Sequence, residues 1–234
     1  MLNAVLAGKK RGTGLEGQRR LLDQAEGAED VLTASVFERL SYLSDSQFSA
    51  VMSALLQEPF GPLRDIEYWP SWYLQDGARV EPDVVLRDNR RTLLVEAKRH
   101  DNLRQQSARQ LANELTAGWR EGCLPDDCLL LTLGGMDDLG EMARAHLQSG
   151  IEQAIAKECR RPFKLICRSW QQLFQAVRIC AEANASAGES RLVEDLGRCF
   201  AWHGLRTHPM RWLDGLLPAG INTSSGAFSA WSLE

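Results

Sequence analysis

The chain has 234 residues, of which 44% are hydrophobic and 25% are charged, and this composition is typical of a folded globular protein rather than a disordered one. The formal net charge of -4 and the isoelectric point near 5.7 argue against a protein that coats nucleic acid non-specifically, because such proteins carry a basic surplus. Any contact with nucleic acid must therefore be local, or be assisted by a partner.

The cellular compartment is indicated by what the sequence lacks. Residues 1–8 are apolar but too short for a signal peptide and have no basic region before them. No later stretch is long and apolar enough to span a bilayer, so we expect no membrane association. The six cysteines are scattered and form no C-x-x-C pair, which favours reduced thiols in a cytoplasmic protein.

The first part of the chain predicts one long helical region followed by strands. Residues 1–27 are Gly-rich and basic and predict an irregular or β-like lead-in. The segment 29–43 has the spacing of an amphipathic helix that continues loosely to about residue 56 and ends at Phe60-Gly61-Pro62. Apolar and β-branched runs then predict strands at 66–69 with 71–74, at 79–86 and at 92–99.

The second part alternates helix and strand. We predict helices at 102–119, 137–159, 169–181 with Ser169 as N-cap, and 190–202, strands at 128–133 and 163–168, and a polar linker at 183–189. This order predicts an α/β fold with a mixed central sheet flanked by helices. We expect one α/β domain over 1–182, with its core at 29–133, and a helical or irregular extension over 183–234 packed on the same domain.

The strands 79–86 and 92–99 flank a polar segment, which indicates a β-hairpin. Because side chains alternate along a strand, Leu94, Glu96 and Lys98 share one face. Two charges after an apolar run need an explanation, since buried charge is costly unless it is paired or bound to metal.

The register of this hairpin decides where Asp83 lies. A tight turn centred on Asn89-Arg90 places Asp83 opposite Glu96, and Asn tolerates the left-handed conformation that such turns require. A turn centred on Asp88-Asn89 places Asp83 opposite Leu94 but on the same face. Either register brings two carboxylates within reach of one cation, whereas a three-residue loop would not.

Such a pair of strands can hold a hard metal ion. Asp83, Glu96, the carbonyl of Ala97 and water supply the all-oxygen shell that Mg²⁺ or Mn²⁺ prefers. A bound ion lowers the pKa of water and stabilises charge on a phosphate, while Lys98 orients or activates the nucleophile. The competing interpretation is a surface hairpin with a Glu–Lys pair.

Pro82-Asp83 and Glu96-Ala97-Lys98 resemble the motif of the PD-(D/E)xK, or restriction-endonuclease-like, nuclease superfamily, and the element order over 29–133 resembles its αβββαβ core. The resemblance implies a metal-dependent nuclease that hydrolyses DNA in preference to RNA, within a defence or repair system. Asp83, Glu96 and Lys98 would be its catalytic residues.

The resemblance also implies an acidic residue on the first core helix and a Gln on the helix after the lysine. Helix geometry favours Glu29, which lies in the apolar stripe, as a further ligand of the metal or its water, over Glu38, which we expect to face solvent. The alternative for Glu29 is that it only complements the helix dipole. On the later helix the resemblance favours Gln110 as a catalytic residue, with Gln106 beside it at i, i+4 spacing.

A second interpretation of the sequence stays open. The acidic isoelectric point and the lack of a recognisable DNA-binding module favour a second interpretation, a non-catalytic nuclease-fold subunit that binds within a larger complex. A partner protein would then supply specificity.

Trp69 and Trp72 have the chemistry to stack on bases, but aromatic residues at strand spacing are more often buried, and we predict that they pack in the core.

Overall fold

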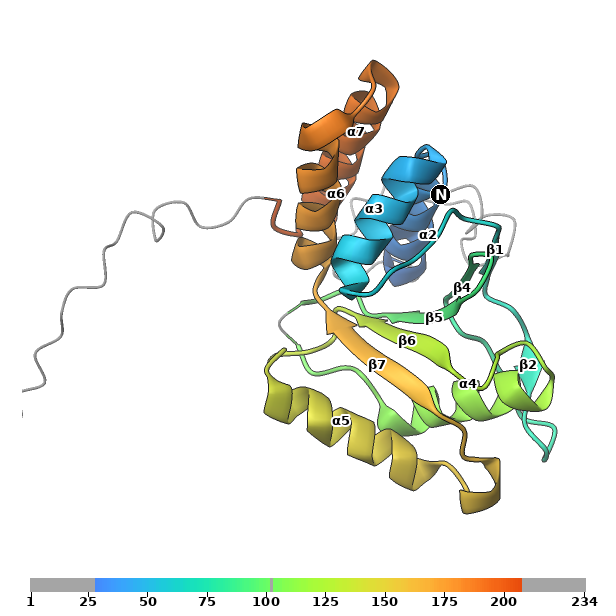
Figure 1. The fold of residues 1–234 in the computed structure, drawn as a ribbon. Coiled ribbons are helices and arrows are strands. Elements are labelled where there is room, and N and C mark those ends of the chain that lie inside the picture. The colour runs from blue at the N-terminus through green and yellow to red at the C-terminus, as the bar shows by residue number, and fades with distance from the viewer. Residues whose placement is uncertain (1–27, 102, 208–234) are drawn as a thin grey trace, which may run out of the picture.

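The computed structural model describes residues 28–101 and 103–207 (Figure 1). The predicted lead-in at 1–27 and the end of the predicted extension, from residue 208, lie outside these residues. No helix within the described ranges is long and apolar enough to cross a membrane.

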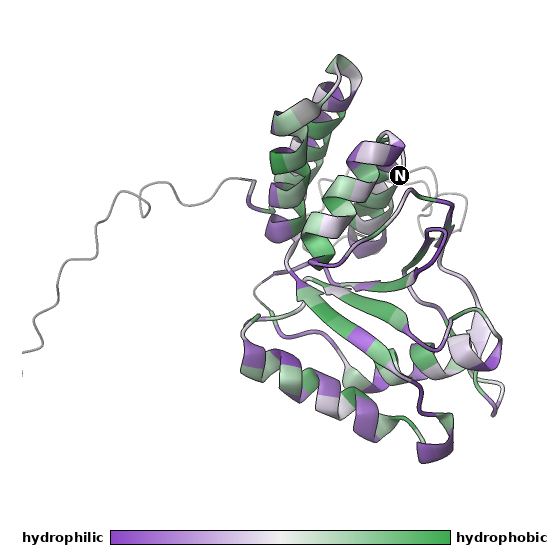
Figure 2. Ribbon diagram, in the orientation of Figure 1, coloured by the Kyte–Doolittle hydropathy of each residue, from purple (hydrophilic) through white to green (hydrophobic). Residues whose placement is uncertain are grey.

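A five-stranded mixed sheet lies at the centre of the fold, with its strands in the order β1-β4-β5-β6-β7. Their bounds are β1 Asp65–Tyr68, β4 Val84–Arg87, β5 Thr92–Ala97, β6 Cys128–Leu133 and β7 Phe163–Arg168. β4 is antiparallel to β1 and β5, whereas β5, β6 and β7 run parallel. Every residue of β5 and β6 is buried, as expected for inner strands covered on both faces, and Figure 2 shows these strands mainly in hydrophobic green.

Helices cover both faces of the sheet (Figure 1). On one face lie α2 Ala28–Leu40, α3 Asp45–Leu56, α6 Trp170–Asn184 and α7 Ala187–Trp202, and on the other lie α4 Ala108–Arg120 and α5 Glu141–Ala154. Leu93 and Val95 pack on the first side, while Leu94 packs against α4 on the second. Glu96, two residues after Leu94, therefore faces α4. The predicted mixed α/β sheet flanked by helices is confirmed.

Several element boundaries agree with the prediction. The strands at 128–133 and 163–168 are observed with those bounds. Ser169 caps α6 as predicted, because its hydroxyl accepts a hydrogen bond from the Gln172 N–H and the Gln172 side chain accepts one in return from Ser169 N–H. Trp69 and Trp72 are buried, as predicted.

The predicted strand at 79–86 is wrong, because it is interrupted at Pro82, which has no N–H to donate to a neighbouring strand. Its first part forms β3 (Arg79–Val80), which pairs with β2 (Trp72–Tyr73) in a separate two-stranded sheet. Only the second part, β4, joins the main sheet. Asp83 lies at the junction, directly before β4.

The boundaries of several predicted helices differ from those observed, and at Ser107 and Ser186 a serine side chain caps the helix that follows. The region 29–56 is two helices, with Ser44 as N-cap of α3. α4 begins at Ala108 rather than at 102, because the Ser107 hydroxyl accepts a hydrogen bond from Gln110 N–H. The helix predicted at 137–159 is divided into α5 and a short 3₁₀ helix, Lys157–Cys159. The linker predicted at 183–189 is only two residues long, since Ser186 caps α7.

The hairpin between β4 and β5 has the first of the two predicted registers. Arg87 pairs with Thr92, which leaves Asn89-Arg90 at the centre of the turn, and the same register places Asp83 opposite Glu96. The predicted left-handed conformation is wrong, because Asn89 does not have a positive φ. The Asp88 carboxylate holds the turn instead.

Asp88 does so by accepting backbone hydrogen bonds on both oxygens. Oδ1 accepts from the N–H groups of Arg90 and Arg91, each at 2.6 Å, and Oδ2 accepts from Gly61 N–H at 2.5 Å. These bonds lower the pKa of Asp88 even though burial alone would raise it. A side chain thus supplies the turn geometry that the sequence pattern assigned to the backbone.

α7 is held to the N-terminal helices and to α6. Phe200 lies in the same core cluster as α2 and α3, and its ring centroid is 6.1 Å from that of Trp170. At the surface, Arg39 Nε donates to Asp195 Oδ2 at 2.6 Å and Ser44 Oγ donates to Glu189 Oε1 at 2.6 Å. The part of the predicted extension that is described therefore packs on the α/β fold.

The end of β6 makes a close approach that only glycine permits. Gly134 and Gly135 have φ values of 69° and 67°, in the left-handed region. A Cβ atom on Gly134 would overlap the carbonyl oxygen of Lys98 and would lie 2.9 Å from Nε1 of Trp170. That indole nitrogen donates to the Lys98 carbonyl at 2.7 Å, so the glycine leaves room for the bond.

We expect Gly134→Ala to lower the free energy of unfolding by clearly more than Gly77→Ala. Gly77 also has a positive φ, 83°, but no atom lies within 4 Å of an added Cβ, so its substitution measures the backbone cost alone, about 1 kcal/mol. At Gly134 the clash with Lys98 and Trp170 adds to that cost. Urea unfolding of both variants measures the difference, and equal losses would show that the predicted clash is relieved.

Candidate active site

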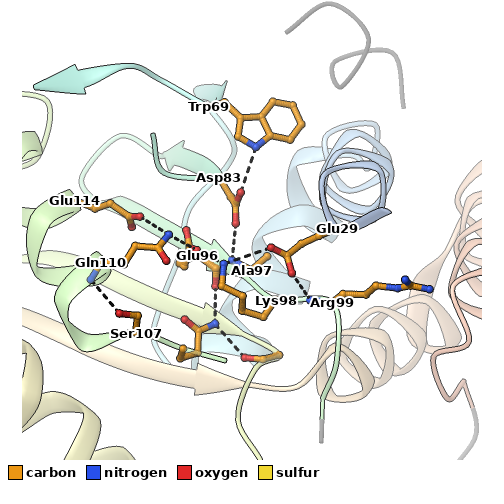
Figure 3. A network of polar contacts seen from close by, with 12 residues as sticks. Glu29, Trp69, Asp83, Glu96, Ala97, Lys98, Arg99, Ser107, Gln110 and Glu114 are labelled. Atoms are coloured by element: carbon orange, nitrogen blue, oxygen red, sulfur yellow. Dashed lines mark hydrogen bonds and ion pairs between the residues drawn. The ribbon is translucent and has the colours of Figure 1, made fainter. Parts of the chain in front are cut away.

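Charged and amide side chains from four separate elements converge beside the C-terminal end of β5 (Figure 3). Asp83 lies directly before β4, Glu96 comes from β5, Glu29 from α2 and Gln110 from α4. Lys98 follows β5 directly, and its Nζ lies 2.6 Å from Glu96 Oε1 and 3.4 Å from Glu29 Oε1. The residues that the sequence pattern singled out are therefore brought together.

Both carboxylate oxygens of Asp83 accept hydrogen bonds from the protein. Oδ2 accepts from Ala97 N–H at 2.8 Å, and Oδ1 accepts from the Trp69 indole Nε1–H at 3.2 Å. Burial, and then the charge of Glu96, raise the pKa of Asp83 well above its ordinary value, although the bond from Ala97 opposes this. Asp83 thus links β4, β5 and Trp69, and its surroundings disfavour the ionised form of its carboxyl group.

Glu96 is 2% exposed and has one satisfied and one unsatisfied oxygen. Oε1 accepts from Lys98 Nζ at 2.6 Å and from Gln110 Nε2 at 2.7 Å. Oε2 is buried and has no hydrogen-bond partner among the described residues. Burial, and then the charge of Glu114, raise the pKa of Glu96 to about 8.

Lys98 is held at both ends. Its backbone N–H donates to Leu133 O at 2.8 Å, and its carbonyl accepts the bond from Trp170 described above. Burial alone would lower the pKa of the ammonium, but the negative charges of Glu96 and Glu29 outweigh burial and hold the pKa above its usual range. The lysine is therefore a fixed cation among carboxylates.

The structure distinguishes the two candidate acids of the first helix. Glu29 reaches the cluster, and its Oε2 also accepts a hydrogen bond from Arg99 N–H at 2.8 Å. The prediction that Glu38 faces solvent is wrong, because Glu38 is only 7% exposed. Residues 31–38 are all buried, so α2 lacks the exposed polar face that the amphipathic pattern implied.

The sequence interpretation missed Glu114. Gln110 Nε2 donates to both Glu96 Oε1 and Glu114 Oε1, the latter at 2.9 Å, so the amide bridges two acids. Burial, and then the charge of Asp83, raise the pKa of Glu114 to about 8. The available signal was its i, i+4 spacing from Gln110, next to the buried Leu115.

Gln106, the other predicted glutamine, donates hydrogen bonds to backbone carbonyl groups. Its Nε2 donates to Glu96 O at 3.3 Å and to Gly134 O at 3.1 Å. It therefore ties the loop after β6 to β5 and does not touch the acidic side chains through these bonds.

The cluster has the donor chemistry for a hard cation. Within 28–101 and 103–207, no group of three or more His, Cys, Asp or Glu side chains is arranged as a ready metal site. Mg²⁺, however, commonly uses one or two carboxylates and completes its shell with water. The buried, unpartnered Oε2 of Glu96 fits that requirement.

The raised pKa of Glu96 predicts that the metal-free protein loses stability as the pH rises. The folded carboxyl, with a pKa of about 8, keeps a proton that the unfolded one, with a pKa near 4.5, releases. Between these values the free energy of unfolding falls by up to about 1.4 kcal/mol per pH unit for each retained proton. Glu96→Gln should flatten this slope in urea unfolding with EDTA between pH 5 and 8.

The control for this measurement is Glu152→Gln, because Glu152 is exposed and also accepts a bond from a glutamine, Gln148. It should leave the slope of the wild-type protein unchanged. Parallel curves for Glu96→Gln and the wild type would contradict the assignment.

The chain is similar along most of its length to a protein of Pasteurella multocida (strain Pm70). It is 38% identical over 223 residues to the uncharacterized protein PM0110 of that organism, a match that covers 92% of this chain and 85% of that protein. No family model matches the chain, and no solved structure matches it. The identity and the coverage show that the chain belongs to the same family as the uncharacterized protein PM0110.

Proposed function

We propose that the protein is a metal-dependent nuclease of the PD-(D/E)xK type that hydrolyses phosphodiester bonds of DNA. The observation that carries the proposal is the meeting of buried Asp83 and Glu96 with the Lys98 ammonium at the end of one hairpin. A buried acid pair next to a fixed cation is costly to stability, and perturbed carboxyls of this kind cluster at functional sites.

The order of elements supports a restriction-endonuclease-like core. Leaving out α3 and the separate β2–β3 hairpin, the chain runs α2, β1, β4, β5, α4, β6, which is the αβββαβ order. Within it, β1, β4 and β5 are antiparallel and β6 adds parallel to β5. The acidic residues and the lysine lie at the central hairpin, which is where the resemblance puts the site.

Mg²⁺ or Mn²⁺ is the cofactor that this donor set favours, held by Asp83, Glu96 and the carbonyl of Ala97, with Glu29 beside them. When bound, the ion would activate water and stabilise charge on the scissile phosphate. The free Oε2 of Glu96 is available to it directly, whereas Asp83 must give up a bond from Trp69 or Ala97.

Lys98 and Gln110 complete the proposed site in different ways. Because its neighbours hold Lys98 in the charged form, it acts by orienting the phosphate or the water and by stabilising negative charge. Gln110 positions Glu96 through the bond to Oε1, which leaves Oε2 available.

A second candidate function is a non-catalytic nuclease-fold subunit in a larger complex, for example in defence or repair. The observation that favours it is the full engagement of Asp83 by Ala97 and Trp69. The net charge of -4 is consistent with a partner that supplies DNA contacts in either case. A digestion assay separates the two functions.

We expect the purified protein to cleave DNA with Mg²⁺ or Mn²⁺, and to show little turnover with Ca²⁺, which is larger and looser in geometry. Linear, circular, single-stranded and double-stranded DNA, together with RNA, should be tested in parallel. Glu96→Gln should abolish cleavage and keep or raise the metal-free melting temperature, because it replaces a buried carboxyl group that can ionise with a neutral amide of the same size. Undiminished cleavage in excess EDTA, or by this variant, would rule out the proposed site.

For Lys98→Ala we expect turnover to fall by about 100-fold or more, the magnitude typical of losing a charge-stabilising group. Metal affinity should stay the same or rise, because a positive charge leaves the cluster. Lys164→Ala is the matched control, since Lys164 is an exposed lysine on β7 that pairs with Glu58. Turnover and calorimetric metal titration measure the two effects, and an active Lys98→Ala protein would make Lys98 a structural residue only.

A further inference from the structure

Trp69 adopts a backbone conformation that a bulky residue normally avoids. Its φ is 49°, in the left-handed region, and Pro70 follows it, although a residue before proline favours an extended conformation. Within the described ranges Gln57 also has a positive φ, but it lies at the C-terminal end of α3, where this conformation is common. Trp69 lies directly after a strand instead. Strain kept beside a candidate site points to a role for the side chain that it places.

The left-handed conformation turns the indole of Trp69 towards α2. Regular alternation along β1 would put Trp69 on the face of Glu67, which pairs opposite Val85 on the α4 side of the sheet. Trp69 instead packs against Ala34 of α2 and is only 6% exposed. From this position its Nε1–H reaches Oδ1 of Asp83 at 3.2 Å (Figure 3). The strained backbone is therefore what brings the indole to the carboxylate.

Trp69 and Asp83 are joined by a second bond, between their main chains. The N–H of Trp69 donates to the Asp83 carbonyl at 3.0 Å and so continues the β1–β4 pairing by one residue. This bond keeps the two residues in register whatever the indole does. The indole can therefore leave the carboxylate by a small rotation of its own side chain, without loss of sheet pairing.

The bond that Asp83 accepts from Ala97 is harder to give up. It is shorter, at 2.8 Å, and its donor is a main-chain N–H of β5. Ala97 is fully buried, so this N–H would have no water to turn to, and an unpaired buried N–H is costly. Asp83 therefore frees Oδ1, held by the indole, more readily than Oδ2.

We propose that Trp69 is a positioning residue for Asp83, whose indole N–H holds Oδ1 until a divalent cation binds and then releases it to the ion. The proposal rests on the metal of the proposed function and names which bond is exchanged. An N–H donor and a cation compete for the lone pairs of the same oxygen, so the indole bond lowers metal affinity. In return, it keeps a buried carboxylate oxygen satisfied and aimed before the ion arrives.

The test follows the indole N–H signals of isotope-labelled protein by NMR while Mg²⁺ is added, with no nucleic acid present. The Trp69 signal is identified by its absence in Trp69→Phe and by proximity to Ala34 and Tyr68. We expect it to move to lower proton frequency as the bond to Asp83 is lost. The Trp119 signal should stay in place, because that indole donates to the Pro125 carbonyl, at the end of α4 away from Gln110.

Calorimetric titration with Mn²⁺ measures the competition directly. Trp69→Phe keeps an aromatic ring without a donor and should bind Mn²⁺ about 2- to 10-fold more tightly, the range for one hydrogen bond between neutral groups. Trp119→Phe is the matched control, since Trp119 is also buried and also donates through its indole. Its affinity should equal that of the wild type. If Trp69→Phe does not fold, the Mg²⁺ titration of the wild type decides by itself.

The outcomes separate this proposal from the nuclease. A Trp69 signal that stays in place at saturating Mg²⁺, or a folded Trp69→Phe that binds Mn²⁺ no more tightly than the wild type, would overturn the role of Trp69. Cleavage of DNA by the same wild-type protein would then leave the proposed function standing. A signal that moves in a protein without cleavage would support the role of Trp69 and count against the nuclease. A wild type that binds neither ion would remove both.

Discussion

A cluster of buried carboxyl groups between β5 and α4 is the constraint on which the rest of the structure depends. Glu96 and Glu114 are almost completely buried, and Asp83 lies beside them, with only the Lys98 ammonium to oppose them from within the cluster. An apolar core would be more stable at these positions. The fold bears this cost because two closely packed hydrophobic layers, one on each face of the sheet, hold β5 in place.

Hydrogen bonds from neighbouring residues limit how these carboxyl groups and the Lys98 ammonium are arranged. Glu96 and Glu114 accept hydrogen bonds on one carboxylate oxygen only, whereas Asp83 accepts them on both oxygens from neutral donors. The backbone of Lys98 is fixed by its bonds to Leu133 and Trp170. The backbone that carries the lysine is therefore fixed, and the ammonium is held beside Glu96 by their ion pair at 2.6 Å. A site organised in this way is rigid before any ligand arrives, which is what electrostatic catalysis requires.

The hairpin and its acids were predictable because strand alternation and the polar turn both act over a few residues. The register of Asp83 opposite Glu96 was one of the two that the sequence allowed, and Asp88, rather than a left-handed Asn89, holds the turn that selects it. The break in the preceding strand at Pro82 also has a local cause, the missing N–H of proline, which the strand predicted over 79–86 does not take into account. Glu114 was not identified because a single acid on an amphipathic helix looks like any polar residue until packing buries it. Burial of Glu38 depends on long-range packing that helix periodicity does not contain.

The contacts of α7 have a consequence for the protein during its synthesis. Glu29 is carried by α2, and α2 is held by Arg39–Asp195 and by core packing against Phe200. The Lys98 carbonyl similarly accepts its hydrogen bond from Trp170 only after α6 has been made. A nascent chain that already contains the whole acidic hairpin still lacks these contacts with α6 and α7 until residues near 200 leave the ribosome. Assembly of the cluster is thereby delayed until α7 has been made, so that a chain interrupted before α7 is released without an organised site.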